Sequence, residues 1–173
     1  MRIACGCRPS VPATAFDEAA THMSFTLMTP APGDHPELIR VWESSVRATH
    51  DFLPEHYLVL LRDKLLGQYL QAVTLIGCQD QQGRICGFAG VSNGDVHMLF
   101  VADEYRSKGV GKRLLKHAVQ VLGATRLDVN EQNPQALAFY QHQGFEVSGR
   151  SATDGLGQPY PLLHLRLRGS APA

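Results

Sequence analysis

The sequence has few cysteines, no excess of either charge and no long apolar run. Its four cysteines, at positions 5, 7, 78 and 86 of 173 residues, form neither a CxxC pair nor a Cys/His cluster with zinc-site spacing. Lys and Arg total 16, as do Asp and Glu, so the formal net charge is zero. This balance gives no general electrostatic reason to expect nucleic acid or a membrane surface as a partner. We therefore expect neither partner, no metal, and reduced thiols.

The apolar segments and the first residues also lack membrane-targeting features. No apolar run approaches the roughly 18 residues that a membrane-spanning helix requires. The stretch from Met1 to Cys7 lacks the apolar core of a signal peptide. These absences predict a cytoplasmic protein.

The length predicts one domain that can bury a core without disulfides. Residues 1–22 mix Pro, Ala, Thr and Gly with little apolar periodicity, which predicts a mobile N-terminal tail. Because Met23 directly precedes the first strand-like run, translation from Met23 is one hypothesis for this tail. We expect the domain to occupy residues 23–169 and a short C-terminal tail to occupy residues 170–173.

The first half of the domain reads as two helices followed by an antiparallel meander. Helical spacing predicts helices over 36–47 and from Leu58 to Tyr69, and Asp34 with Glu37 predicts a capping box for the first helix. Apolar runs with β-branched residues predict strands over 24–29, 72–78, 85–92 and 96–101.

The second half alternates helices and strands. A helix is predicted from Val110 until Gly123, then a strand over 125–130 and a helix that Asn133 caps and Gly144 ends. Two strands follow, over 145–150 and 162–168. The whole pattern predicts an α/β (α+β) fold, with a mixed, mostly antiparallel sheet of six to seven strands and about four helices.

A glycine-bearing connector between a strand and the helix at Val110 predicts an anion site. Helix starts leave backbone N–H groups unpaired and carry the positive end of the helix dipole. Gly109 and Gly111 would let a phosphate approach these groups, and four basic side chains surround the turn: Arg106, Lys108, Lys112 and Arg113. An ordinary strand-to-helix turn with solvated charges is the alternative.

The connector does not match two common nucleotide motifs. A Walker A loop requires glycine at position 106 and Ser or Thr at position 113, where this chain has arginine. A Rossmann fingerprint requires glycine at position 114, which is leucine.

Arg106, Gly109 and Gly111 instead resemble the coenzyme A pyrophosphate loop of the GNAT superfamily, the Gcn5-related N-acetyltransferases. That signature is Arg or Gln, two residues, Gly, one residue, then Gly or Ala. Residues 24–168 also follow the element order of this superfamily. The chain is most similar to the small bacterial YjaB-type acetyltransferases, which share its stretches 48–53, 129–133 and 155–163.

The resemblance implies that an acetyl group passes from acetyl-CoA directly to a primary amine of a small molecule, protein or peptide. Tyr140 would protonate the departing thiolate as the general acid. The implied coenzyme site comprises Leu99, Phe100, Val101, Arg106, Ser107, Lys108, Gly109, Val110, Gly111, Lys112, Asn133 and Tyr140. A non-catalytic acyl-CoA-binding or sensing module is the alternative function, and both a monomer and a homodimer remain open.

Three side chains are candidates for the general base that deprotonates the amine. Asp95 aligns with a catalytic glutamate of some family members, and Asp128 matches an acidic residue of others. His97 lies two residues after Asp95 and is therefore expected on the same face of the strand. An ordinary histidine pKa of about 6.5 favours His97 among the three. A water relay is the remaining alternative.

The acceptor side should be formed by the connector between the first two helices and the last hairpin loop. Its candidate residues are Trp42, His50, Asp51, Phe52 and Tyr160. An aromatic wall with an acidic residue suits a cation or a peptide N-terminus. The alternative is an ordinary surface loop.

Overall fold

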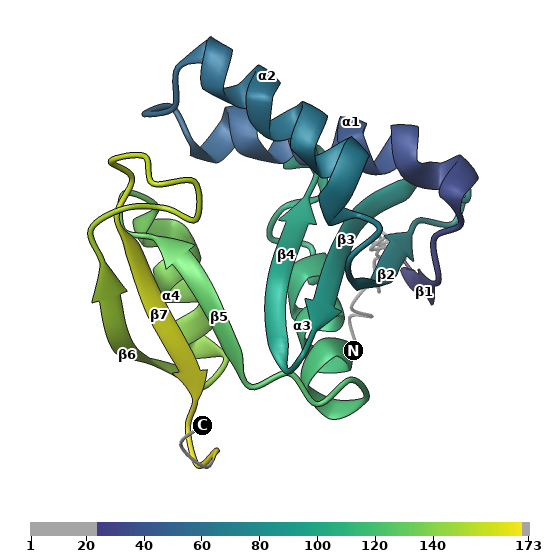
Figure 1. Ribbon diagram of the computed structural model, residues 1–173. Coiled ribbons are helices and arrows are strands. Elements are labelled where there is room, and N and C mark those ends of the chain that lie inside the picture. The colour runs from purple at the N-terminus through teal and green to yellow at the C-terminus, as the bar shows by residue number, and fades with distance from the viewer. Residues whose placement is uncertain (1–23, 171–173) are drawn as a thin grey trace, which may run out of the picture.

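The computed structural model describes residues 24–170 (Figure 1). The tail expected at residues 1–22, the hypothetical start at Met23 and residues 171–173 lie outside this part of the chain. The elements in chain order are β1 (Thr26–Met28), α1 (His35–Thr49), α2 (Glu55–Lys64), β2 (Thr74–Gln79), β3 (Ile85–Ser92), β4 (Asp95–Val101), α3 (Val110–Gln120), β5 (Arg126–Asn130), α4 (Pro134–His142), β6 (Phe145–Ser151) and β7 (Leu162–Leu167).

Within residues 24–170, seven strands form one mixed sheet in the order β1-β2-β3-β4-β5-β7-β6. Strands β4 and β5 run parallel, and the other neighbouring strands pair antiparallel. The mixed, mostly antiparallel sheet with four helices confirms the fold class predicted from the sequence.

The parallel pair β4 and β5 separates along its length (Figure 1). The two strands pair only at Asp95 with Arg126 and at Val96 with Leu127. Beyond these positions, the backbone N–H and C=O groups of β4 and β5 that face one another are not hydrogen-bonded across the pair. A cavity lies there, bordered by both strands.

A bulge interrupts β4 at His97. Gly90 pairs with Met98 and Val91 pairs with Val96, so His97 has no opposite residue on β3. A bulge breaks the regular alternation of side chains and bends the strand. The expectation that Asp95 and His97 share one face of a regular strand therefore does not apply to this strand.

Two helices follow the strands that border the cavity. Right-handed crossovers from β4 to β5 and from β5 to β6 run in the same direction across the sheet, so they place α3 and α4 on the same face. Both helices lie behind the strands in Figure 1, whereas α1 and α2 cross the top of the view. The predicted apolar face of α3 is confirmed, since Val110, Leu114 and Leu115 are buried.

The close packing of α3 on β3 depends on Gly87, which has no side chain. A Cβ on Gly87 would lie 2.7 Å from Val110 Cγ1 and 3.0 Å from the Phe100 carbonyl oxygen. Any other residue at position 87 would therefore push α3 away from the sheet, and with it the loop that precedes the helix.

The capping box predicted for the first helix is wrong. The Asp34 carboxylate accepts from the Ala31 N–H (2.8 Å), within a short 3₁₀ turn that precedes α1. Glu37 accepts from the Ile85 N–H (3.1 Å) and thereby ties α1 to β3. Both side chains make tertiary or turn contacts in place of the cap.

The second helix differs from its prediction at its end. Helix α2 stops at Lys64, and residues Leu65–Tyr69 form one π turn, in which the Leu70 N–H donates to the Leu65 carbonyl (3.1 Å). The wider turn lets Leu65 and Leu70 both enter the core, at 3% and 2% exposure. Leucines five residues apart would lie on different faces of an α-helix.

Candidate active site

A cavity of about 590 Å³ lies between β4 and β5 and extends to α4, the loop before α3 and the end of α1. This volume lies within the ordinary range for small-molecule sites. Thirteen of the residues singled out from the sequence line it: His50, His97, Leu99, Phe100, Val101, Arg106, Ser107, Gly109, Gly111, Lys112, Asp128, Asn133 and Tyr140. The structure therefore brings together residues from five separate segments of the chain.

The loop before α3 opens its backbone toward this cavity. Ser107 and Gly109 have positive φ angles of 61° and 86°, which turn the chain sharply before the helix. A Cβ on Gly111 would lie 3.5 Å from Phe139 Cζ and 3.6 Å from Val101 Cγ2. A long side chain at position 111 would therefore enter the space between α4 and β4, close to the free N–H groups of the helix start.

The basic side chains of the loop differ in their roles. Arg106 donates to Gln135 Oε1 (2.5 Å) and so joins the loop to α4. Lys112 lines the cavity and has no acidic partner among residues 24–170. Lys108 lies over the Tyr105 ring, 5.4 Å from its centre, and outside the cavity lining. Val110 points into the core, so only its backbone is available to a ligand.

A buried carboxylate that the sequence analysis missed anchors the loop. The Tyr105 hydroxyl donates to Asp80 Oδ2 (2.6 Å) across the sheet. This hydrogen bond is the main cause that lowers the pKa of Asp80 to about 2, and hydrogen bonds from Arg84 lower it further. The same bond, together with burial, raises the pKa of Tyr105 to about 12. Because Asp80 belongs to the turn after β2, a polar residue in a hairpin turn was its only sequence signal.

Tyr140 lies on α4 with its ring in the core and 8% of its surface exposed. Burial raises the pKa of its hydroxyl above the ordinary value. The hydroxyl has no hydrogen-bond partner among residues 24–170, and that part of the chain also has no fully buried polar side-chain atom without a partner. The Tyr140 hydroxyl must therefore face the open cavity that this residue lines.

Asn133 caps α4 as the sequence predicts. Its side-chain Oδ1 accepts from the Ala136 N–H (3.1 Å), and the residue is 8% exposed. The cap directs the helix so that Tyr140, two turns later, reaches the cavity that Asn133 also lines.

The three candidate bases have different surroundings. Asp95 lies outside the cavity lining, and both of its oxygens accept from Arg126 at 2.8 Å, which lowers its pKa. His97 and Asp128 line the cavity, and both are exposed.

Asp128 belongs to a hydrogen-bonded chain that the sequence analysis missed. Asp128 Oδ1 lies 2.6 Å from His164 Nδ1, and His164 Nε2 lies 2.7 Å from Ser151 Oγ. The glycine opposite His164 leaves space for the ring, since a Cβ on Gly149 would lie 3.2 Å from His164 Cδ2. A polar residue between two leucines of β7 was the available sequence signal for His164.

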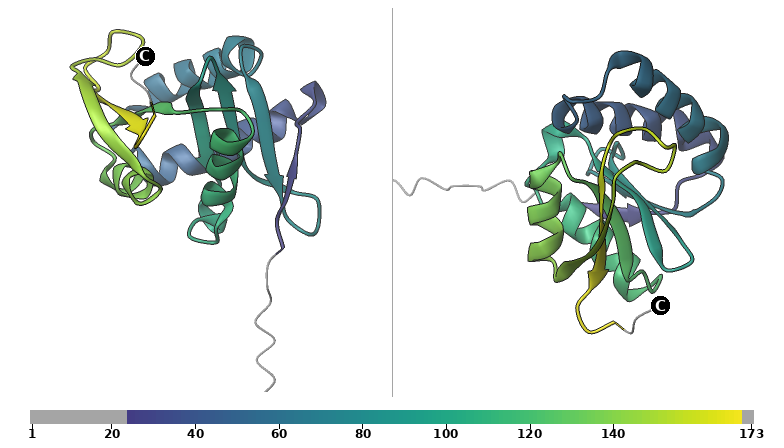
Figure 2. Two further views of the ribbon diagram at one scale, coloured as in Figure 1. Left: turned by 90° about the horizontal axis from the view of Figure 1, so that it is seen from below. Right: turned by 60° about the vertical axis from the view of Figure 1, so that its left-hand side comes forward.

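Aromatic rings connect the end of α1 to the segment between β6 and β7. Phe52 lies 5.4 Å from His50 and 6.2 Å from Tyr160, and Tyr160 lies 5.1 Å from Tyr57, all between ring centres. The Tyr57 hydroxyl donates to Asp154 of the same segment. Both views in Figure 2 and the view in Figure 1 show this segment beside the α1–α2 connection.

Two residues expected on the acceptor side, Trp42 and Asp51, lie outside the large cavity. Trp42 is 5% exposed and packs in the core beneath α2, so the structure does not bring it to the large cavity. Asp51 is exposed at the connector and lies outside the cavity lining. Phe52 and Tyr160 also lie outside the cavity lining: Phe52 contacts His50 of the lining, and Tyr160 contacts Phe52.

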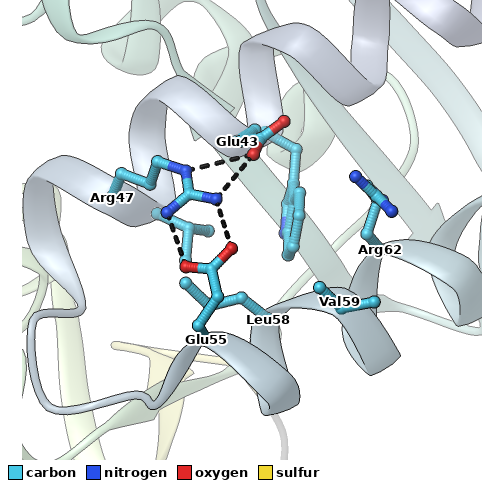
Figure 3. Close-up of a pocket in the computed structure, with 8 residues that line it drawn as sticks. Glu43, Arg47, Glu55, Leu58, Val59 and Arg62 are labelled. Carbon is cyan, nitrogen blue, oxygen red and sulfur yellow. Dashed lines mark hydrogen bonds and ion pairs between the residues drawn. The ribbon is translucent and has the colours of Figure 1, made fainter.

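A second, smaller pocket lies between α1 and α2 (Figure 3). Arg47 fills its rim, since the guanidinium donates to Glu43 and Glu55 at 2.7–3.0 Å and so joins the two helices. The space measures about 10 Å³, which is at most the room for one water molecule. This pocket therefore belongs to the helix packing.

Residues 24–170 contain no candidate metal site and no candidate membrane span. In this part of the chain, no three His, Cys, Asp or Glu side chains gather as a possible metal site. None of the helices there is both long and apolar enough to span a membrane.

The splayed parallel strands, the glycine loop before α3 and the buried tyrosine together define an acyltransferase architecture. Residues 53–156 match the acetyltransferase (GNAT) domain family. The chain belongs to this family and is an N-acetyltransferase of the GNAT type.

The most informative relatives are bacterial enzymes. The chain is 40% identical over 134 residues to the peptidyl-lysine N-acetyltransferase YjaB of Escherichia coli, which covers 78% of this chain and 90% of YjaB. It is 40% identical over 129 residues to YjaB of Salmonella typhimurium, covering 75% and 88% of the two chains.

Solved structures agree with the fold. The solution structure of apo YjaB from Escherichia coli superposes with a TM-score of 0.78 and 36% identity, over 86% of this chain and all of that one. The PaiA N-acetyltransferase of Thermoplasma acidophilum, in complex with coenzyme A, gives a TM-score of 0.66 at 23% identity over 84% of this chain and 99% of that one, a likeness of fold alone.

Proposed function

We propose that this protein acetylates the ε-amino group of lysine in peptides or proteins, with acetyl-CoA as the cosubstrate. The observation that carries the proposal is the cavity between β4 and β5, which opens on the glycine loop at one end and on His50 at the other. The printed activity of the two YjaB relatives, peptidyl-lysine N-acetylation, supports lysine as the acceptor.

The coenzyme would bind along β4 with its pyrophosphate at the start of α3. The loop from Arg106 to Lys112 offers unpaired N–H groups, the positive helix end and the Lys112 ammonium. The separated backbone of Leu99, Phe100 and Val101 would bond the pantetheine arm. One of its N–H groups would polarise the thioester carbonyl in the manner of an oxyanion hole.

The amine would attack the thioester directly within a ternary complex. Tyr140 supports this mechanism, because its hydroxyl faces the cavity and its raised pKa keeps it protonated as a general acid at neutral pH. Of the three bases considered from the sequence, His97 and Asp128 line the cavity, whereas Arg126 holds Asp95 outside it.

Turnover on a lysine-containing peptide tests the proposal. Purified protein with acetyl-CoA should release free thiol only when the peptide is present, and mass spectrometry should find the added acetyl group on lysine. Acetyl-CoA binding without thiol release would favour a sensing module instead.

Gly111→Gln tests the placement of the coenzyme. The longer side chain should fill the space between α4 and β4, so acetyl-CoA affinity measured by calorimetry should fall by about 100-fold or more. Gly33→Gln is the matched control, because a Cβ there meets nothing within 4 Å and the φ angle is not positive. Affinity retained in Gly111→Gln would contradict this placement.

We also propose a cytoplasmic location. Cys78 and Cys86 are free thiols in the buried part of adjacent strands, as suits a protein of a reducing compartment.

A further inference from the structure

His50 ends α1 at the wall of the large cavity, and its backbone is held on both sides. Its N–H donates to the Val46 carbonyl (2.8 Å), and its own carbonyl accepts from the Leu53 N–H (3.0 Å). The imidazole ring packs against Phe52. The position of the ring is therefore set by a helix end, a turn and an aromatic neighbour.

The hydrogen bonds of Thr49 determine which ring nitrogen of His50 carries the proton. Thr49 Oγ1 lies 2.8 Å from the Ser45 carbonyl, which can only accept, so the single hydroxyl proton points at Ser45. The contact of 2.7 Å between Thr49 Oγ1 and His50 Nδ1 then requires a proton on Nδ1. A neutral imidazole of this tautomer has its lone pair on Nε2.

Nε2 is available for proton transfer. It has no hydrogen-bond partner in the described residues 24–170, whereas Nδ1 is bonded to Thr49. His50 belongs to the lining of the cavity that is proposed to hold both substrates.

The charge state of His50 suits a base. Burial lowers its pKa below the ordinary 6.5, opposed by a smaller effect of the neighbouring Asp51. The other titratable or charged groups of the lining are His97 on β4, Tyr105, Arg106 and Lys112 around the α3 loop, Asp128 on β5 and Tyr140 on α4, and Tyr160 approaches through Phe52. The neutral imidazole therefore predominates at pH 7.

We propose that His50 is the general base of the transfer, and that Nε2 takes a proton from the ammonium group of the acceptor lysine. Thr49 is the positioning residue that keeps the proton on Nδ1. This inference rests on the proposed function, since it assigns a role within the same reaction.

The protons and electron pairs of the reaction balance. One N–H bond of the ammonium breaks and an Nε2–H bond forms, which leaves a lone pair on the amine. That lone pair forms a bond to the thioester carbonyl carbon, and the C–S bond breaks with its electrons on sulfur. Sulfur takes the Tyr140 proton, the new amide nitrogen returns a proton to the Tyr140 oxygen, and the imidazolium proton passes to solvent.

The other candidates have weaker geometry for this step. Arg126 occupies both oxygens of Asp95, and His164 lies within hydrogen-bond distance of Asp128. His97 has no hydrogen bond within residues 24–170 that would fix its tautomer. Among the histidines of residues 24–170, only His50 combines a place in the lining with a tautomer set by its neighbours.

The pH profile of kcat/KM for a lysine peptide tests the assignment. In the wild type it should form a plateau from about pH 6.5 upward, because the neutral imidazole accepts the proton of the bound ammonium. In His50→Gln only the rare free amine can react, so kcat/KM should rise about tenfold per pH unit toward the lysine pKa near 10.4. At pH 7 the loss should be about 100-fold or more.

Two further histidine variants control this result. His56→Gln makes the same change at an exposed position six residues later on α2, and its profile should match the wild type. His97→Gln tests the rival base and should keep the plateau. A plateau retained in His50→Gln, or a slope that appears in His97→Gln instead, would overturn the assignment.

Variants of Thr49 test the tautomer. Thr49→Val removes the acceptor of the Nδ1 proton and should lower kcat/KM by on the order of tenfold, whereas Thr49→Ser keeps a hydroxyl and should restore most of it. ¹⁵N spectra of the histidine side chains should show His50 protonated at Nδ1 in the wild type and a mixture of tautomers in Thr49→Val. An unchanged tautomer and rate in Thr49→Val would contradict the role of Thr49.

The outcomes separate this inference from the proposed function. Wild-type protein that binds acetyl-CoA but acetylates no lysine peptide would refute the proposed function. Wild-type turnover with an unaltered profile in His50→Gln would refute only the role of His50. Calorimetry with acetyl-CoA shows that each variant is folded before its kinetics are compared.

Discussion

Tyr140 combines two properties that rarely occur together in one tyrosine. Its ring packs edge-on against Phe139 and Phe145 in the core, while its hydroxyl has no hydrogen-bond partner in the described part of the chain and faces the cavity. Burial raises the pKa, so the neutral phenol persists to a higher pH than in an exposed tyrosine. Both properties suit the proposed role of Tyr140 as the proton donor to the thiolate.

Tyr140→Phe should lower kcat by about 100-fold and leave the KM for acetyl-CoA within about twofold, because only the proton donor is lost. Steady-state kinetics with thiol detection measures both. Tyr69→Phe, at an exposed tyrosine after α2, is the matched control. The wild type should also show no loss of activity from Tyr140 ionisation up to about pH 10, the ordinary tyrosine pKa. An unchanged kcat in Tyr140→Phe would refute the acid role.

At the scale of elements, the loop before α3 is held from two directions. Tyr105 anchors its start to the Asp80 turn, and Arg106 joins it to Gln135 of α4. A loop held in this way loses little conformational freedom when an anion binds. The positive φ angles at Ser107 and Gly109 then complete a turn whose backbone is already set for the ligand.

Tyr105→Phe should lower acetyl-CoA affinity by roughly fivefold in calorimetry, because the loop loses its anchor. It should also lower the free energy of unfolding near neutral pH, as measured by urea denaturation. The folded pKa of Asp80, about 2, lies below its ordinary value of 3.8, so this stabilisation is present above about pH 4. The difference between wild type and variant should therefore shrink as the pH falls from 4 toward 2, and a constant difference would contradict this account.

At the scale of the whole molecule, the β4–β5 separation leaves two halves joined by a short stretch of sheet and by contacts across the cavity. Tyr57 of α2 and Asp154 of the β6–β7 segment form such a contact beside the proposed acceptor side. Asp154 also accepts from the Leu156 and Gln158 N–H groups at 2.9 Å, so one carboxylate shapes the segment and ties it to the other half.

Tyr57→Phe should release the β6–β7 segment from α2. We expect the KM for the acceptor peptide to rise about fivefold and the free energy of unfolding to fall by about 1 kcal/mol, since one hydrogen bond of a buried hydroxyl is lost. Acetyl-CoA affinity should remain within twofold, because the loop proposed to bind the coenzyme lies elsewhere. Kinetics over a range of peptide concentrations, with Tyr69→Phe as the control, checks this; an unchanged peptide KM would exclude a role for this contact in acceptor binding.

Much of the architecture could be predicted because local patterns agree with the final fold. The spacing of Val110, Leu114 and Leu115 predicts α3, and Asn133 with Pro134 predicts the start of α4; the structure confirms both. The predicted cap was wrong because other partners took both side chains. Asp34 accepts from Ala31 in the preceding turn, and Glu37 accepts from Ile85 of β3, which is 48 residues away in the chain.

The residues of the candidate site also divide into those that local sequence patterns could predict and those that they could not. Loop residues such as Gly109 and Gly111 are close in sequence, so their spacing alone indicated an anion site. Trp42 was expected on the acceptor side because aromatic composition cannot distinguish a wall of the site from a core residue. His164 and Asp80 were missed, since their partners Asp128 and Tyr105 are 36 and 25 residues away in the chain.

The sequence by itself determined the order of helices and strands, the family and the glycine-bearing turn that is proposed to bind phosphate, because each depends on neighbours within a few residues. Only the tertiary structure decided which polar groups meet. It bound Asp95 to Arg126, left the Tyr140 hydroxyl facing the cavity, and placed His50 in its lining with its tautomer set by Thr49. The charge and proton position of such groups depend on burial and on bonds formed across elements, which the linear pattern does not contain.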